Sequence, residues 1–150
     1  MKYTDGKNIM VYAQSADGAP VGAALETVSK AAELAKANGE EVIAVVFGKD
    51  TDTKTVITAG ASKVLVAGEE GLQAEEKAQI LVKLAEKYQP KAVYMAGTPE
   101  GKMIAPAVSA VFESGCVTDV TGITSDGVYT AFSYNGNVLN DMKMGCLLYT

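Results

Sequence analysis

Residues 91–123, KAVYMAGTPEGKMIAPAVSAVFESGCVTDVTGI, decide the fold of this 150-residue chain. They predict a strand over residues 91–97, a turn, a helix that begins at Pro99, and a second strand after Cys116. Thr98 is an N-cap type of residue, and proline suits the first position of a helix. In open α/β sheets the loop after such a strand lies at the carboxyl edge, where helix amides favour an anion. This loop is therefore the first place to expect a ligand.

The chain before residue 91 alternates short apolar runs with amphipathic stretches. The pattern predicts strands at 8–13, 41–47 and 63–67, and helices at 21–37, from Asp50 or Thr51 to Gly60, and at 74–88. Strands that alternate with helices at this spacing predict right-handed βαβ crossovers and a parallel sheet. We therefore expect a Rossmann-like α/β domain of the adenine nucleotide alpha hydrolase-like type. Its parallel sheet would have five strands in the order 3-2-1-4-5, with helices on both faces.

Beyond Ile123 this alternation ends. The tight-turn dipeptides Asp126-Gly127 and Asn135-Gly136 flank the alternating stretch VYTAFSY, and the apolar run MGCLLYT closes the chain. These residues predict an antiparallel hairpin extension over 127–150. It is more apolar than a solvated hairpin needs, so we expect it to contact a partner subunit or a second copy of the chain. Since no linker or low-complexity segment interrupts the sequence, residues 1–150 are expected to form a single domain.

The charged residues exclude several kinds of function. All 13 basic residues are lysine, histidine is absent, and 18 acidic residues bring the net charge to −5. Without histidine there is no Ser-His or Cys-His nucleophile pair and no HExxH zinc helix. Without arginine there is no guanidinium fork for phosphate, and the acidic balance argues against nucleic acid as a partner. We expect a protein that is not itself an enzyme and holds no metal.

Cysteine content and hydropathy predict the compartment. Cys116 and Cys146 are too few for a disulfide framework or a zinc ribbon, so reduced thiols are expected. The amino-terminal residues lack the apolar core of a signal peptide, and no run approaches the roughly 20 apolar residues of a membrane helix. The sequence therefore predicts a cytoplasmic protein without a membrane partner.

The loop at 97–102, GTPEGK, has two interpretations that the residues leave open. In one, the Thr98 hydroxyl and the Lys102 ammonium join the helix amides around a phosphate. In the other, the loop is an ordinary capped helix start. It lacks the GxxxxGK[ST] pattern of a P-loop, so no machinery for nucleotide hydrolysis is visible.

Several motifs together resemble the first domain of electron transfer flavoprotein alpha subunits. GKMIAP at 101–106 and TDVTGI at 118–123 match the pattern of a glycine and a basic residue, Ala-Pro, an alanine-rich helix and Thr-Asp-x-Thr-Gly. AGASKVLVAG at 59–68 and YNGN at 134–137 resemble two further pieces of the family in the same order. The resemblance spans most of the chain and implies the same α/β fold.

The resemblance also implies a role. In that family a second domain holds most of the FAD, a beta subunit of similar fold completes the heterodimer, and the complex exchanges electrons with flavin dehydrogenases. The present chain stops near the end of the first domain, so the FAD domain is expected to be absent. The chain would then be a scaffold and subunit-interaction part without catalytic residues. It would bind no cofactor alone, while the complete complex would hold FAD.

A nucleotide contact is the remaining expectation. In the related beta subunits the equivalent loop holds AMP, and by that resemblance Thr98, Gly101, Lys102 and Met103 are the candidate contacts here. Lys102 stands where the family usually has arginine. The alternative function is accordingly a free-standing adenine-nucleotide-binding module that uses residues 97–103.

Overall fold

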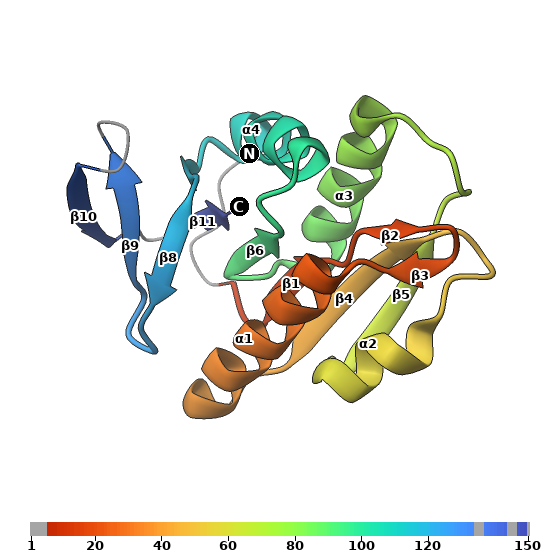
Figure 1. Ribbon diagram of the computed structural model, residues 1–150, viewed down its shortest axis with the longest axis horizontal. Coiled ribbons are helices and arrows are strands. Elements are labelled where there is room, and N and C mark those ends of the chain that lie inside the picture. Colours follow the sequence, from red (N-terminus) through yellow and green to blue (C-terminus); the bar gives the residue numbers. More distant parts are fainter. Residues whose placement is uncertain (1–5, 134–136, 144–146, 150) are drawn as a thin grey trace.

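The structure is a computed structural model that describes residues 6–133, 137–143 and 147–149. A central parallel sheet is covered by helices on both faces, and a small antiparallel sheet lies at the end opposite β5 (Figure 1). The elements are β1 Ile9–Tyr12, β2 Ser15–Ala16, β3 Ala19–Pro20, α1 Gly22–Asn38, β4 Val42–Phe47, α2 Thr53–Ala59, β5 Lys63–Ala67, α3 Ala74–Tyr88, β6 Ala92–Met95, α4 Pro99–Phe112, β7 Gly115–Val117, β8 Val120–Ile123, β9 Val128–Ser133, β10 Val138–Lys143 and β11 Leu147–Tyr149.

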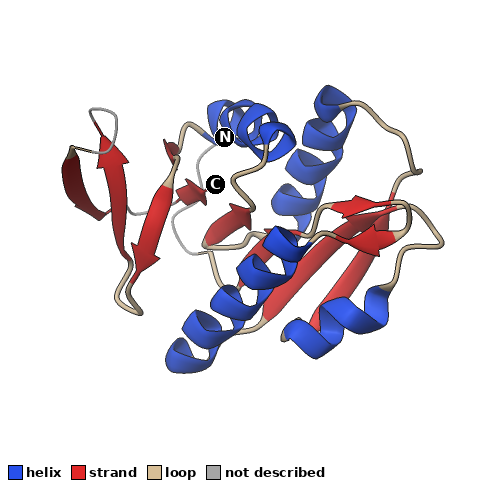
Figure 2. Ribbon diagram, viewed as in Figure 1, coloured by secondary structure: helices blue, strands red, loops and turns tan. Residues whose placement is uncertain are grey.

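Two apolar cores cover the two faces of the parallel sheet. Ile9 and Val11 of β1 point to the face covered by α1 and α2. Met10 and Tyr12 point to the face covered by α3 and α4. Every residue of β1, β4 and β6 is buried, as strands covered on both faces require. The helices on either side of the strands in Figure 2 show this layering, which confirms the expected fold class.

The strand count and order differ from the expectation at one strand. The sheet has six strands in the order β5-β4-β1-β6-β11-β7, and neighbouring strands are parallel throughout. The first four strands follow the predicted order, but β11 lies between β6 and β7. Residues 147–149 therefore do not belong to the hairpin extension. The physical reason is that an unalternating apolar run suits a strand covered on both faces, and its local sequence does not say which strands it pairs with.

The predicted fifth strand is divided in two. β7 joins the parallel sheet, whereas β8 belongs to the antiparallel sheet, whose order is β10-β9-β8. Asp119 separates them with a φ of 55°, in the left-handed region, and this turns the chain out of the first sheet. Cys116 thus lies within β7 and not ahead of the strand. The expected hairpin is confirmed for β9 and β10, while the turn Asn135-Gly136 lies outside the described residues.

The helix boundaries follow local signals closely. Gly39 ends α1 with a φ of 67°, and α4 begins at Pro99 with Thr98 as its N-cap. The start of α2 is a correction, because Asp52 and not Asp50 or Thr51 caps it by accepting hydrogen bonds from two backbone amides. Thr51 is buried, and its hydroxyl donates to the carbonyl of the strand before it.

Candidate functional site

The candidate site lies between the carboxyl ends of β1 and β6. The chain leaves β1 for α1 on one face of the sheet and leaves β6 for α4 on the other face. This reversal makes a topological switch point, the place where open α/β sheets bind ligands. Gln14 follows β1 and Thr98 follows β6, and the Thr98 hydroxyl donates to Oε1 of Gln14 at 2.5 Å. A direct hydrogen bond therefore bridges the two strand ends.

Thr98 and Gly101 form the start of α4. The Thr98 hydroxyl also accepts a hydrogen bond from the Gly101 amide at 3.1 Å, so it is engaged both as donor and as acceptor. Gly101 is buried against the residue that follows β6, and a Cβ at this position would lie 2.1 Å from the carbonyl oxygen of Ala96. Only glycine allows this close approach of the helix to the strand.

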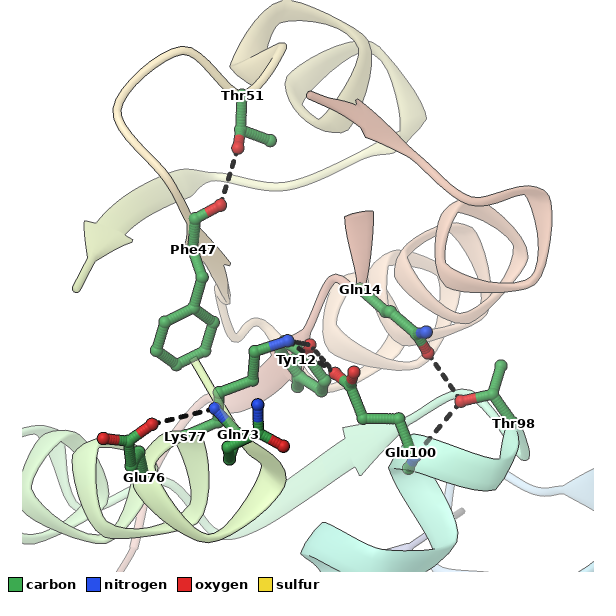
Figure 3. A network of polar contacts seen from close by, with 10 residues as sticks. Tyr12, Gln14, Phe47, Thr51, Gln73, Glu76, Lys77, Thr98 and Glu100 are labelled. Carbon is green, nitrogen blue, oxygen red and sulfur yellow. Dashed lines mark hydrogen bonds and ion pairs between the residues drawn. The ribbon is translucent and has the colours of Figure 1, made fainter. Parts of the chain in front are cut away.

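A second set of polar groups lies beside this cap. The Tyr12–Lys77–Glu100 cluster brings together the last residue of β1 and the first turns of α3 and α4 (Figure 3). Nζ of Lys77 lies 2.9 Å from Oε1 of Glu100 and 3.3 Å from the Tyr12 hydroxyl. The Tyr12 hydroxyl donates to the same carboxylate oxygen. The cluster is thus closed by hydrogen bonds among its own members.

Burial makes this cluster energetically important. The Lys77 side chain is 11% exposed, and its ammonium lies 5.9 Å and 5.7 Å from the ring centroids of Tyr12 and Phe47, which favours cation–π attraction. Burial raises the pKa of Tyr12 far above its ordinary value, and the hydrogen bond to Glu100 and the charge of that carboxylate raise it further. Tyr12 therefore keeps its proton and remains a donor. Since Glu100 is the ion-pair partner of Lys77, its loss would leave a buried ammonium without a counter-charge.

The other two residues predicted to bind a nucleotide have different surroundings. Lys102 forms an ion pair with Asp119 at 2.6 Å, and both side chains are about half exposed. Met103 is 59% exposed on the surface of α4. The structure therefore joins Thr98 and Gly101 at the cap but does not bring Lys102 and Met103 into the same cluster. Nucleotide binding by these four residues stays a prediction.

Sequence reasoning missed the residues that dominate the site. Gln14 is in an unremarkable loop, and Tyr12 reads as part of an apolar strand. A signal existed for Lys77, because it shares one face of α3 with Ala78, Leu81 and Ala85, where a lysine is unexpected. That signal does not identify a partner 23 residues further along the chain.

Hollows of moderate size lie elsewhere on the described part of the chain. A pocket of about 310 Å³ lies between α1, the end of β6 and β8, and one of about 320 Å³ lies near the amino end of the sheet. Tyr94 lines both, and its hydroxyl lies 3.2 Å from that of Tyr129. A groove of about 430 Å³ runs between α3 and α4. Residues 98–103 line none of these three hollows.

The described residues contain neither a candidate metal site nor a candidate membrane span. No cluster of three or more Cys, Asp or Glu side chains there has the arrangement of a metal site. Among the described helices, none has the length and apolar character needed to cross a membrane.

Comparison with known proteins identifies relatives over most of the chain. The sequence model of the electron transfer flavoprotein domain matches residues 9–144. The alpha subunit of electron transfer flavoprotein from Clostridium acetobutylicum is 29% identical over 131 residues, which are 84% of this chain and 39% of the relative. The alpha subunit from Thermoanaerobacterium thermosaccharolyticum is 28% identical over 148 residues, or 93% of this chain and 45% of the relative. The LctC subunit of a lactate dehydrogenase (NAD(+),ferredoxin) from Acetobacterium woodii is 28% identical over 142 residues, which are 89% of this chain and 34% of the relative.

The chain spans less than half of the length of each of these relatives. Among solved structures, a universal stress protein in complex with cAMP overlaps with a TM-score of 0.44 at 16% identity, over 73% of this chain and 93% of the other. That overlap is too weak to carry any statement about a ligand.

Proposed function

The chain belongs to the electron transfer flavoprotein family, and from this premise we propose that it works as the amino-terminal domain of an alpha-type subunit in a flavin electron carrier. The observation that carries the proposal is the domain match over residues 9–144, together with alpha subunits as relatives over most of the chain. In this role the cofactor is FAD, held by the complete complex. The expected cytoplasmic location is part of the same proposal.

The domain itself acts as a scaffold and contributes no catalytic group. The polar side chains at the switch point support this role, because their hydrogen bonds are made within the chain. Thr98 bonds to Gln14 and to the Gly101 amide, and Lys77 bonds to Glu100. The free-standing adenine-nucleotide module, the alternative function, draws less support from the same geometry. The Thr98 hydroxyl would have to give up two hydrogen bonds to reach a phosphate.

The proposed partner is a beta-type subunit, and flavin dehydrogenases would be reached through the complex. The contact surface would include the outer face of the antiparallel sheet. Phe132 and Leu139 lie opposite each other in β9 and β10 and are 47% and 60% exposed. An exposed apolar cross-strand pair on the face of a sheet favours contact with another chain, whether a beta-type subunit or a second copy.

Co-purification with an electron transfer flavoprotein beta subunit tests this proposal. We expect the two chains to form a complex, and the double substitution Phe132→Asp and Leu139→Asp to weaken it at least about tenfold, because each change buries a charge at the contact. The matched control is Ile57→Asp, which alters an equally exposed apolar residue on α2, away from this sheet. A strict monomer at high concentration that also ignores the beta subunit would contradict the proposal.

A further inference from the structure

The two edge strands of the parallel sheet differ in how well they are protected from another strand. β7 forms one edge with three residues and is followed by the turn at Asp119. β5 forms the other edge with five residues, KVLVA, in regular register with β4 and without a proline or a bulge (Figure 1). Natural edges are commonly short, bulged or charged, because their free N–H and C=O groups can pair with another chain. β5 has one such feature, the lysine at its first position.

The side chains along β5 are more exposed than those of the neighbouring strands. Every residue of β1, β4 and β6 is buried, whereas none of the five residues of β5 is. Val66 is 49% exposed, and Ile57 is 54% exposed on α2, the helix that packs against β5. Apolar side chains beside free backbone groups favour association by strand addition.

The order of residues in β5 fits a second copy of the same strand in the antiparallel direction. When Leu65 lies opposite Leu65 of the second copy, Val64 lies opposite Val66 and Lys63 lies opposite Ala67. This register pairs all five residues and sets the branched apolar side chains against one another. It is also self-complementary, because a two-fold axis at Leu65 makes each contact occur twice.

Charge favours the same direction. Lys63 begins the strand, and Glu69 and Glu70 follow its carboxyl end after Gly68, all of them exposed. Antiparallel pairing brings the lysine of each copy toward the two glutamates of the other, whereas parallel pairing would set the two lysines side by side. We propose that two copies of this chain pair through antiparallel β5 strands and join their two parallel sheets into one.

This interface is separate from the contact proposed for a beta-type subunit. The antiparallel sheet lies at the end opposite β5, so its outer face stays accessible when two copies pair (Figure 1). Pairing through β5 would therefore place two alpha-type chains at the centre of an assembly, with room for a beta-type subunit at each end. The inference rests on β5 and its flanks and does not depend on the proposed function.

Sedimentation velocity of the native chain tests the pairing. We expect a monomer–dimer equilibrium with a Kd of roughly 10 to 100 μM, because one short strand edge and its flanks make a small interface. Val66→Lys should raise the Kd at least about tenfold, because it sets an ammonium against Val64 of the second copy. The matched control is Met103→Lys, which makes the same charge change at a residue 59% exposed on α4 and should leave the Kd unchanged.

Charge reversal tests the direction of pairing. Lys63→Glu should weaken the dimer, and so should Glu69→Lys with Glu70→Lys, because each change brings like charges together. The three substitutions in one chain should restore the dimer, since the charges are then complementary again. Circular dichroism checks that each variant is folded, and these residues are exposed, so the variants remain informative if Val66→Lys does not fold.

Three results would overturn the proposal. One is a native chain that stays monomeric at about 1 mM, far above the expected Kd. Another is a dimer that persists in the folded Val66→Lys and Lys63→Glu variants. The third is a dimer that dissociates when Phe132→Asp and Leu139→Asp are introduced, since self-association would then use the antiparallel sheet. Binding of a beta-type subunit is measured separately by co-purification, so either proposal can fail while the other holds.

Discussion

At the scale of single residues, the start of α4 depends on the absence of a side chain at one position. We predict that Gly101→Ala lowers the free energy of unfolding by about 3 kcal/mol, because its Cβ would lie 2.1 Å from the Ala96 carbonyl oxygen and backbone must move. Urea denaturation would measure the loss. Gly22→Ala is the matched control. Nothing lies within 4 Å of a Cβ there, so that helical substitution should be neutral or stabilising. Equal effects from the two variants would contradict the packing argument.

A second residue-scale prediction concerns the reactivity of Cys116. Burial raises the pKa of the Cys116 thiol, and a hydrogen bond with Ser109 offsets only part of that effect. The thiolate is the reactive form, so a raised pKa means less nucleophile at pH 8. Iodoacetamide should therefore alkylate Cys116 more slowly in the folded chain than in urea, as followed by mass spectrometry of the peptide that contains it. Equal rates in both states would show that the thiol is not protected.

At the scale of elements, β11 holds two parts of the parallel sheet together. It pairs with β6 on one side and with β7 on the other, through Leu147, Leu148 and Tyr149. These three residues link the last segment of the chain to strands that lie much earlier in the sequence. Without them, β7 would have no partner in the parallel sheet among the described strands.

We predict that a chain truncated after Lys143 loses hydrogen-exchange protection in β7 first and in β6 to a smaller degree. The reason is that β7 loses its ladder while β6 keeps its pairing with β1. A chain that lacks Thr150 alone is the control and should exchange like the full chain. Unchanged protection of β7 in the truncated chain would mean that β11 adds little to the sheet.

At the scale of the whole molecule, charge and cavity size bear on cofactor binding. We predict that the 150-residue chain alone binds no FAD. The three hollows described measure about 310 to 430 Å³, the buried Lys77 ammonium is paired with Glu100, and the sequence contains no arginine to hold a pyrophosphate. Expression with added riboflavin, purification and a visible spectrum would check this. Stoichiometric yellow protein that survives dialysis would reveal a flavin site within this chain.

The sequence alone determined those features that depend on neighbouring residues. Thr98-Pro99 at the start of α4 and Gly39 at the end of α1 satisfy backbone groups within one turn, so their residue types were sufficient. Four apolar runs likewise predicted the strands β1, β4, β5 and β6, and the order predicted for these four strands is the observed one.

Only the tertiary structure decided which distant residues meet. β11 lies between β6 and β7, and Lys77 of α3 forms an ion pair with Glu100 of α4. Periodicity along a strand or helix records which face is buried, but it carries no information about the element that buries it. The partner of a buried charge depends on how all the layers pack at once. The local sequence therefore predicted a ligand site at the carboxyl edge, and the folded chain placed its own carboxylate there.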